Sequence, residues 1–271
     1  MKPDPSSLPS APRPPVVEPA PVPEVPAVDI LSAEKIYPNG TRALLPVDLS
    51  LREGEFVTLL GPSGCGKSTL LKMVAGLLKP TAGRIALSDA HLSFVFQEAT
   101  LMPWADVRSN VRLPLDLAGV ARPEANQRVD EALQLVGLQA FAGHRPRELS
   151  GGMQMRVSIA RGLVTRPRLL LMDEPFGALD EITRNKLDAD LLELWRQQGL
   201  TVVFVTHSIT EAVFLSTRVI MMATRPGRVV LDQRIDNPWP RDDDHRTSPA
   251  FNESVRQLQH GLSQASSESA V

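Results

Sequence analysis

The sequence contains one cysteine, Cys65, and no apolar run longer than a β-strand. A single cysteine cannot form a disulfide within the chain or a metal site made only of cysteines, so we expect a reducing compartment. Apolar runs of strand length are too short to cross a bilayer, and prolines interrupt the N-terminal segment where a signal peptide needs an apolar core. We therefore expect a chain that neither spans a membrane nor is exported.

The sequence also lacks a surplus of basic residues. Lys and Arg number 29 and Asp and Glu number 31, which gives a formal net charge of -2. A protein that binds nucleic acid through phosphate contacts generally needs a basic excess. The balance argues against a nucleic-acid partner, although it leaves room for a local basic patch.

The prolines are distributed unevenly, with ten of the 24 in residues 1–28. Because proline fixes φ and removes a backbone donor, neither a helix nor a strand ladder is expected there. We predict a disordered, proline-rich tail over 1–28, with docking to a partner as the alternative. An ordered domain is expected over 29–236, with a helical subdomain inserted at 104–165.

A polar extension is expected at 237–271. Apolar residues recur there every three to four positions, at Phe251, Val255, Leu258 and Leu262. This spacing indicates an amphipathic helix. Packing on the body of the protein is the favoured interpretation, and a weak partner site is the alternative.

Hydrophobic patterning predicts an α/β fold. The expected strands are 30–37, 46–51, 55–60, 84–88, 92–96, 168–172, 201–206 and 217–222. The expected helices are 67–78, with Leu70, Leu71, Val74 and Leu77 on one face, then 105–117 broken at Pro114, 123–136, 150–163 and 181–198. The alternation of strand and helix indicates a mainly parallel sheet covered by helices.

A glycine-rich loop between an expected strand and helix matches the pattern G-x-x-x-x-G-K-[ST]. Its glycines allow successive backbone N–H groups to face an anion at a helix N-terminus. Lys67 is expected to reach the β- and γ-phosphates, and the Ser68 hydroxyl to ligate Mg²⁺. The predicted phosphate-binding residues are Gly61, Pro62, Ser63, Gly64, Cys65, Gly66, Lys67, Ser68 and Thr69.

Cys65 is interpreted mainly as a small residue that fills this tight turn. The nearby helix end and Lys67 are also able to lower the pKa of its thiol. On that basis, alkylation of Cys65 is expected to block nucleotide binding, and MgATP to protect the thiol.

Two carboxylates follow the buried strand expected at 168–172. The carboxyl ends of strands in a parallel sheet are where ligands bind, and adjacent carboxylates beside an apolar strand favour a cation. We assign Asp173 to Mg²⁺ and Glu174 to the attacking water, as base or orienter. The alternative is that both carboxylates cap the following turn.

Two further polar residues follow expected strands. His207 comes after the strand at 201–206 and is expected to donate to the γ-phosphate. Gln97 follows the strand at 92–96, where its amide could contact Mg²⁺ or the water bound to it. The other four histidines are interpreted as surface or loop residues.

A second anion-binding helix end is predicted at Ser150, Gly151 and Gly152, which open the helix expected at 150–163. Serine caps such a helix, and the two glycines leave its N–H groups accessible. Because the chain already has a phosphate loop, the simplest arrangement is a head-to-tail dimer. Each ATP would then lie between the phosphate loop of one copy and this helix end of the other.

Taken together, these motifs resemble the ATP-binding subunits of ABC transporters over about Ile30 to Val230. The corresponding motifs are GPSGCGKST (Walker A), Gln97 (Q-loop), LSGGMQMR (signature), LLLMDE (Walker B), Ala178–Asp180 (D-loop) and His207 (switch histidine). Tyr37 matches the aromatic that stacks on adenine, with a simple strand-end aromatic as the alternative. In the signature, Met153 follows the glycines and Gln154 comes one position later than the usual glutamine.

The resemblance implies a P-loop NTPase core with an N-terminal antiparallel β part and an inserted helical subdomain. The segments EPFGALDEITR, VTHSITEAVFLSTRVIMM and ATRPGRVV are similar to importers for nitrate, sulfonates, taurine and pyrimidine-type vitamin precursors. The resemblance further implies an ATPase that uses ATP and Mg²⁺, with Asp180 crossing the dimer interface. The implied partners are a second copy, integral membrane permease subunits and, indirectly, a periplasmic or extracellular solute-binding protein.

The implied location is the cytoplasmic face of the bacterial cell membrane. Two other classes remain as alternatives. A soluble ABC-type ATPase acting on nucleic acid or ribosomes usually carries coiled-coil insertions, zinc cysteines or two tandem ATPase units. A P-loop kinase would need neither the LSGG run nor the switch histidine. The sequence has one unit and one cysteine, so a transport subunit is favoured.

Overall fold

The computed structural model of the protein describes residues 26–89, 91–224 and 226–268. The predicted tail over 1–28 therefore lies almost entirely outside the described residues. Val28, which was expected to belong to that tail, is fully buried and already forms part of the first strand.

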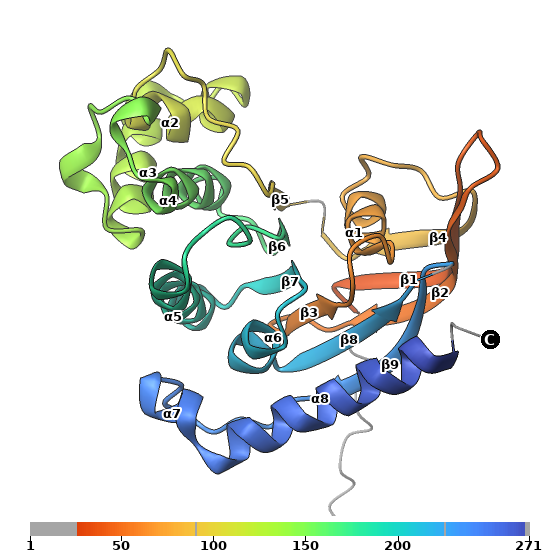
Figure 1. The fold of residues 1–271 in the computed structure, drawn as a ribbon. Coiled ribbons are helices and arrows are strands. Elements are labelled where there is room, and N and C mark those ends of the chain that lie inside the picture. The colour runs from red at the N-terminus through yellow and green to blue at the C-terminus, as the bar shows by residue number, and fades with distance from the viewer. Residues whose placement is uncertain (1–25, 90, 225, 269–271) are drawn as a thin grey trace, which may run out of the picture.

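Two sheets form the centre of the structure (Figure 1). A three-stranded antiparallel sheet has the order β2-β1-β4, and a six-stranded sheet has the order β5-β6-β7-β3-β8-β9. The larger sheet is parallel except at β9, which pairs antiparallel with β8. The strands are β1 Val28–Ile36, β2 Arg42–Leu51, β3 Phe56–Leu60, β4 Ala82–Leu87, β5 Leu92–Val95, β6 Leu169–Asp173, β7 Thr201–Thr206, β8 Arg218–Ala223 and β9 Arg228–Arg234. The expected mainly parallel sheet and N-terminal antiparallel part are confirmed.

The central strands β3, β6 and β7 are buried along their whole length and mostly apolar, because both faces of the sheet are covered. Along β6, Leu169 and Leu171 pack in one cluster with helix α1 and the small sheet, while Leu170 and Met172 pack in the other with α4 to α6. Successive side chains of a strand point to opposite faces, so each strand contributes to both clusters. The large sheet therefore lies in the centre of the core, and the loops that follow its parallel strands meet at one edge.

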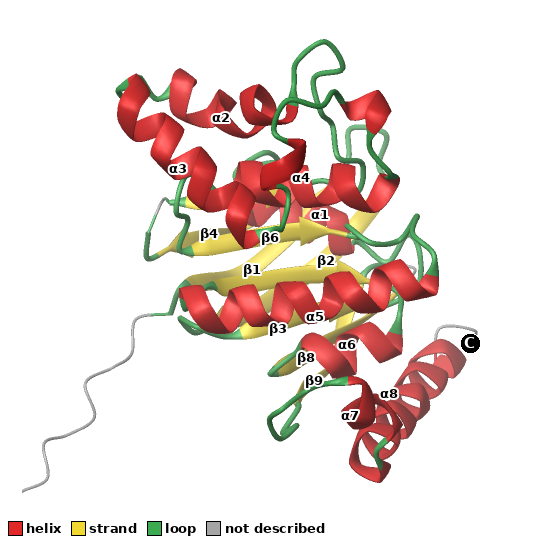
Figure 2. Cartoon of the chain, turned by 90° about the vertical axis from the view of Figure 1, so that its left-hand side faces the viewer, coloured by secondary structure: helices red, strands yellow, loops and turns green. Residues whose placement is uncertain are grey.

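Helices cover the sheet and form a separate group to one side (Figures 1 and 2). Helices α2 and α3 pack on α4 and lie beyond the edge strand β5, within the predicted insertion. Two 3₁₀ turns, at Gln139–Phe141 and Pro146–Glu148, lie between α3 and α4. The helices are α1 Lys67–Val74, α2 Val107–Leu117, α3 Arg122–Leu135, α4 Gly151–Leu163, α5 Glu181–Gln198, α6 Ile209–Leu215, α7 Asp243–Thr247 and α8 Pro249–Glu268.

The expected break at Pro114 is wrong, because α2 continues through this residue. Proline removes one backbone donor and crowds the preceding turn. The helix is held despite this by tertiary packing, since Val107, Val111 and Leu115 are all buried. Its start is fixed by Asp106, which accepts a hydrogen bond from the Ser109 N–H at 2.7 Å.

Helix α1 is shorter than expected. It ends at Val74, and Gly76 follows with a φ of +71°. A left-handed residue stops a helix, and glycine adopts this conformation without a Cβ penalty. Leu77 consequently leaves the predicted apolar face and is 60% exposed.

The C-terminal apolar stripe packs on the body, as favoured. Phe251 and Leu258 of α8 are buried, and Val255 and Leu262 lie against the same core cluster. Helix α8 packs on α6 and β8 (Figure 1). His245 of α7 is also buried, which corrects its interpretation as a surface residue. Among the described residues, we find no helix with the length and apolarity needed to traverse a bilayer.

Candidate functional site

Three neighbouring parallel strands bring the predicted chemistry to one edge of the large sheet. Strand β3 ends at the phosphate loop, β6 at Asp173 and β7 at Thr206. Leu60 pairs with Thr206, and Asp173 pairs with Val205. This register places the glycine-rich loop, the acidic pair and His207 side by side, where parallel sheets bind ligands.

The phosphate loop needs its glycines for two distinct reasons. Gly64 and Gly66 have φ values of +79° and +93°, in the left-handed region that glycine adopts freely. Gly61 is required by close packing instead, since a Cβ there would lie 2.4 Å from the carbonyl oxygen of Met222. The loop then enters α1, whose N-terminal N–H groups point toward an incoming anion.

The ammonium of Lys67 lies inside the loop. Its Nζ donates to the carbonyl oxygens of Gly61 at 2.7 Å and Pro62 at 3.1 Å, and the residue is 4% exposed. The same Nζ lies 3.7 Å from Oε1 of Glu174. A bound phosphate would therefore have to replace one or more of these partners.

The thiol of Cys65 lies in the protein core. Its side chain is fully buried in the cluster formed by β1, β2, β3 and α1, and Gly61 packs against it. Burial raises the pKa of the thiol, and this outweighs the opposing effect of Lys67. The expectation of a lowered pKa is wrong because burial of the sulfur outweighs the effect of Lys67, although the Lys67 Nζ lies only 3.9 Å from Sγ.

Glu174 is held in an unusual conformation beside the loop. Its φ is +45°, a region that costs a non-glycine residue about 1 kcal/mol or more. The Glu174 N–H donates to the carbonyl of Val205 at 3.1 Å, and its own carbonyl accepts from Gly177 at 3.2 Å. These contacts aim the carboxylate between Lys67 and His207, whose Nδ1 lies 3.1 Å from Oε2 of Glu174.

The residues assigned to magnesium have suitable chemistry. The Ser68 hydroxyl donates to Oδ1 of Asp173 at 2.7 Å, and Ser68 and Gln97 line one polar cavity. Mg²⁺ prefers oxygen ligands, and it commonly takes only one or two from protein, with water and phosphate oxygens for the rest. In the described part of the chain, no cluster of three or more His, Cys, Asp or Glu forms a metal site. The hydroxyl of Ser68 and the carboxylate of Asp173 offer two oxygen ligands, which fits a metal held jointly with a nucleotide.

A polar cavity joins most of the predicted nucleotide site. The predicted residues that line it are Tyr37, Ser63, Gly64, Gly66, Lys67, Ser68, Thr69, Gln97 and Glu174. The remaining residues contact this lining. Gly61 and Pro62 accept hydrogen bonds from Lys67, Asp173 accepts one from Ser68, and His207 contacts Glu174.

Five residues of the cavity wall were not predicted from the sequence, namely Thr41, Arg42, Ala43, Pro226 and Gly227. They come from two segments that a bridge between Leu44 and Gly227 joins. A Cβ on Gly227 would lie 2.5 Å from the carbonyl oxygens of Ala43 and Cys65, so this position requires glycine. The Pro226-Gly227 dipeptide signals a turn, but no local pattern indicates that this turn reaches the phosphate loop.

The serine-glycine helix end lies outside that cavity. Ser150 caps α4 by accepting a hydrogen bond from the Met153 N–H at 3.3 Å. Gly151 packs near Leu179, and a Cβ on Gly152 would lie 2.8 Å from Thr183. Ser150, Gly151 and Gly152 do not line the cavity of the phosphate loop.

Asp180 lies in this second group. Its carboxylate caps α5 by accepting a hydrogen bond from the Thr183 N–H at 3.0 Å. This bond lowers the pKa of Asp180. Within one chain, the predicted site residues thus form two separate groups, one at the phosphate loop and one at the start of α4 and α5.

Gln154 has an internal role. Its Nε2 donates to the carbonyls of Pro146 at 3.0 Å and Leu149 at 3.2 Å. These bonds tie the first turn of α4 to the segment that precedes it. The shifted glutamine therefore supports the position of Ser150.

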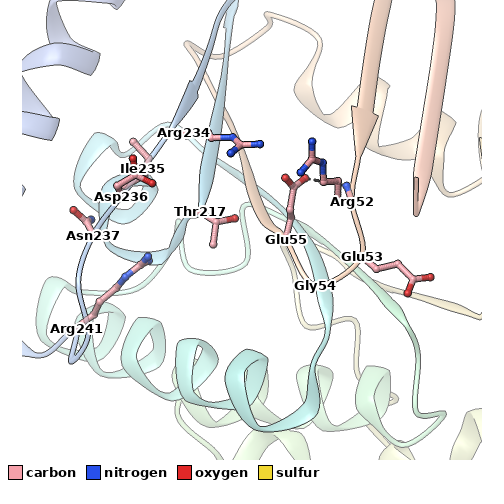
Figure 3. A pocket seen from close by; sticks show the side chains of 10 residues that line it. All are labelled: Arg52, Glu53, Gly54, Glu55, Thr217, Arg234, Ile235, Asp236, Asn237 and Arg241. Carbon is pink, nitrogen blue, oxygen red and sulfur yellow. Dashed lines mark hydrogen bonds between the residues drawn. The ribbon is translucent and has the colours of Figure 1, made fainter. Parts of the chain in front are cut away.

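A separate polar cavity lies at the opposite end of the strands (Figure 3). It is lined by residues that precede β3 and β8 and by residues that follow β9, among them Glu55, Thr217 and Arg241. Arg241 is turned toward the C-terminal end of α6, where it donates to the carbonyls of Phe214 and Ser216. None of the predicted site residues lines this cavity.

Comparison with known proteins matches this chain to ABC transporter ATP-binding proteins, the family that the sequence motifs resemble. The family model described as "ABC transporter" matches residues 44–177. An ABC transporter ATP-binding protein of Methanocaldococcus jannaschii, named as uncharacterized, is 46% identical over 81% of this chain and 84% of its own length. A taurine import ATP-binding protein of Rhizobium johnstonii is 50% identical over 72% of this chain and 77% of its own. An aliphatic sulfonates import ATP-binding protein of Bacillus licheniformis is 43% identical over 83% and 89%.

Solved structures give the same fold. The dimeric structure of a bacterial ABC transporter cassette matches with a TM-score of 0.69 and 35% identity, over 77% of this chain and 98% of that one. The structure of cbiO1 from Clostridium perfringens, described as part of an ABC transporter complex, matches with a TM-score of 0.73 and 27% identity. It covers 91% of this chain and 99% of its own.

Proposed function

Because the chain belongs to the family of ABC transporter ATP-binding proteins and is an ATPase of the import type, we propose that it hydrolyses ATP to drive uptake of a small solute through a separate integral membrane permease. The proposed solute class is nitrate, a sulfonate, taurine or a pyrimidine precursor. Relatives named for taurine and aliphatic sulfonates support this class.

The observation that carries the proposal is the division of the site into two groups. Tyr37, the phosphate loop, Gln97 and Glu174 share one cavity, whereas Ser150, Gly151 and Gly152 lie elsewhere on the same chain. A second copy, related by a twofold axis, would complete each cavity with its own serine-glycine helix end. The dimeric cassette among the solved structures supports this arrangement.

The contacts of Glu174 suggest how this chain's residues would act on ATP. Lys67 and His207 both contact the Glu174 carboxylate, and both are suited to binding a γ-phosphate. When phosphate takes these two partners, the carboxylate becomes available to orient a water molecule and accept its proton. Tyr37 would stack on the adenine, and the N–H groups of residues 61–69 would hold the phosphates.

Magnesium would be held by Ser68 and Asp173, with Gln97 contacting it directly or through water. When bound, it would supply positive charge that stabilises the phosphate oxygens. In the chain, Asp173 and Ser68 already share a hydrogen bond, so their oxygens are positioned for such a role. Removal of Mg²⁺ with a chelator is expected to abolish hydrolysis.

We propose the domain boundaries expected from the sequence: an ATPase domain at 29–236, a helical insertion at 104–165 and an extension at 237–271. The proposed partners are a second copy of the chain, the permease and, indirectly, a solute-binding protein. Nucleic acid is not a proposed partner. The proposed location is the cytoplasmic face of the cell membrane. The insertion and the Gln97 loop would transmit the closure of the dimer to the permease.

Co-expression with the candidate permease from neighbouring genes tests this function. The complex is expected to co-purify and to import one member of a solute panel into vesicles loaded with MgATP. The Glu174→Gln complex provides the matched inactive control. Recovery of the chain on ribosomes or nucleic acid, with no permease bound, would favour the soluble ABC-type alternative instead.

A further inference from the structure

A buried network of polar groups lies directly beneath the switch histidine. Glu211, in the first turn of α6, is 5% exposed, and one of its carboxylate oxygens bonds to the hydroxyl of Thr206. Thr206 precedes His207, and its hydroxyl also accepts a hydrogen bond from the Ser208 N–H at 3.0 Å. The residues on both sides of His207 are therefore anchored to one buried hydroxyl.

The second oxygen of Glu211 faces Arg184. Oε1 of Glu211 lies 3.4 Å from Nε of Arg184, a residue in the first turn of α5. Nη2 of Arg184 donates to the carbonyl of Leu179 at 2.7 Å, immediately before Asp180. Leu179 in turn packs near Gly151. A continuous series of contacts thus joins the start of α4 to His207.

We propose that Arg184 and Glu211 are positioning residues, which set the orientation of His207 according to the position of the loop at 178–180. This proposal rests on the proposed function, in which the serine-glycine helix end contacts the nucleotide held by the other copy. Movement of that helix end would shift Leu179, and the guanidinium of Arg184 would transmit the shift to Glu211 and Thr206. Neither Arg184 nor Glu211 lines the nucleotide cavity.

The charges around the pair explain why it is suited to this role. A buried carboxylate is costly unless it is paired, so Glu211 depends on its partners. A second buried carboxylate, Asp188 of α5, is bound by Arg246 of α7 at 3.1 Å. Arg184 forms the ion pair with Glu211, and Arg246 forms the one with Asp188, so loss of the Arg184 contact would leave Glu211 without its ion-pair partner.

The test is steady-state ATP hydrolysis by the full chain, with MgATP affinity measured separately. Glu211→Gln preserves size and the bond to Thr206 but removes the charge that holds Arg184. Arg184→Met removes the guanidinium. Both variants are expected to lower kcat roughly tenfold, a common size for coupling through a positioned network, while KM and MgATP affinity stay near the original values. Arg184→Lys should recover part of the rate.

Asp190→Asn is the matched control, because Asp190 lies on the same helix and pairs with Arg156 rather than with the switch network. A double-mutant cycle with His207→Ala separates positioning from simple stabilisation. If Glu211 acts through His207, Glu211→Gln should cause little further loss in the His207→Ala background.

Three results would overturn the proposal: a full rate in Glu211→Gln, an equal loss with and without His207, or a loss of MgATP affinity that parallels the loss of rate. The proposed transport function fails differently, when the unaltered chain hydrolyses ATP but never associates with a permease. A failure of either idea can therefore be recognised independently of the other.

Discussion

The Nδ1 atom of His207 lies 3.1 Å from Oε2 of Glu174, and Lys67 lies 3.7 Å from the other oxygen of the same carboxylate. Two groups that can bind a γ-phosphate thus hold the residue that is proposed to orient the water. In the proposed function, phosphate binding to Lys67 and His207 would release the carboxylate. It also makes the contribution of each residue measurable by substitution.

Glu174→Gln is expected to retain MgATP binding and to lose hydrolysis by about 100-fold or more, because an amide cannot accept the proton. The proposed dimer should accumulate, since ATP is bound but not consumed. Light scattering after size exclusion, with and without MgATP, measures this. Glu193→Gln, a change on the exposed side of α5, is the control. A variant that turned over normally would remove Glu174 from its proposed role.

Lys67→Ala is expected to weaken MgATP binding itself. The variant loses the ammonium that is proposed to bind the phosphates, and a charge-assisted hydrogen bond of this kind contributes about 1.5–3 kcal/mol. Titration with a fluorescent ATP analogue gives the affinity. Lys72→Ala, on the exposed side of the same helix, should bind as the unaltered chain does. Equal affinities for the Lys67→Ala and Lys72→Ala variants would contradict the assignment.

Cys65 is expected to react slowly with iodoacetamide in the folded chain. Its side chain is fully buried, and burial raises the pKa of the thiol, so the reactive thiolate is scarce at neutral pH. Cys65→Ala should keep MgATP affinity and lose about 1 kcal/mol of stability from the smaller core side chain. Mass spectrometry follows the modification, with urea-unfolded chain as the positive control. If the native chain were labelled rapidly and MgATP prevented the labelling, the result would instead support a thiol that nucleotide binding protects.

Asp188 is expected to make stability depend on pH. Burial raises its pKa to about 7, an effect to which the charge of Glu211 adds and which Arg246 opposes. The folded chain then binds more protons than the unfolded chain between the two pKa values. The free energy of unfolding should therefore be highest at low pH in this window and fall as pH rises through about 7.

Urea unfolding at about pH 5.5 and about pH 8 tests this linkage. Asp188→Asn removes the titrating group, so its stability should change less between the two conditions. Asp190→Asn, two positions along α5, should retain the pH dependence of the unaltered chain. An identical slope in the Asp188→Asn variant would show that other groups cause the dependence.

Local sequence signals predicted most of the residues in the site. The phosphate loop, the acidic pair and His207 each follow an apolar strand, and parallel pairing brings the ends of such strands to one edge. Capping by Ser150 was likewise evident from the serine and two glycines before a helical pattern. These features depend on residues that are close together in the sequence and on the local conformation of their backbone.

The tertiary structure decided the contacts between segments that are distant in the sequence. Packing of Val107, Val111 and Leu115 keeps α2 continuous through Pro114, although proline by itself disfavours a helix interior. The direction of the Cys65 side chain depends on the core that surrounds it, so its pKa could not be inferred from the adjacent Lys67 alone.

The amino-acid sequence by itself thus determined most of the strand and helix order and the phosphate-binding chemistry, because both depend on periodicity and local conformation. It did not predict β9, α6 or α7. The fold decided that Gly227 closes the nucleotide cavity, that His245 is buried and that Arg184 meets Glu211. Each of these contacts joins segments far apart along the chain. Their geometry exists only after the strands have paired and the helices have packed on them.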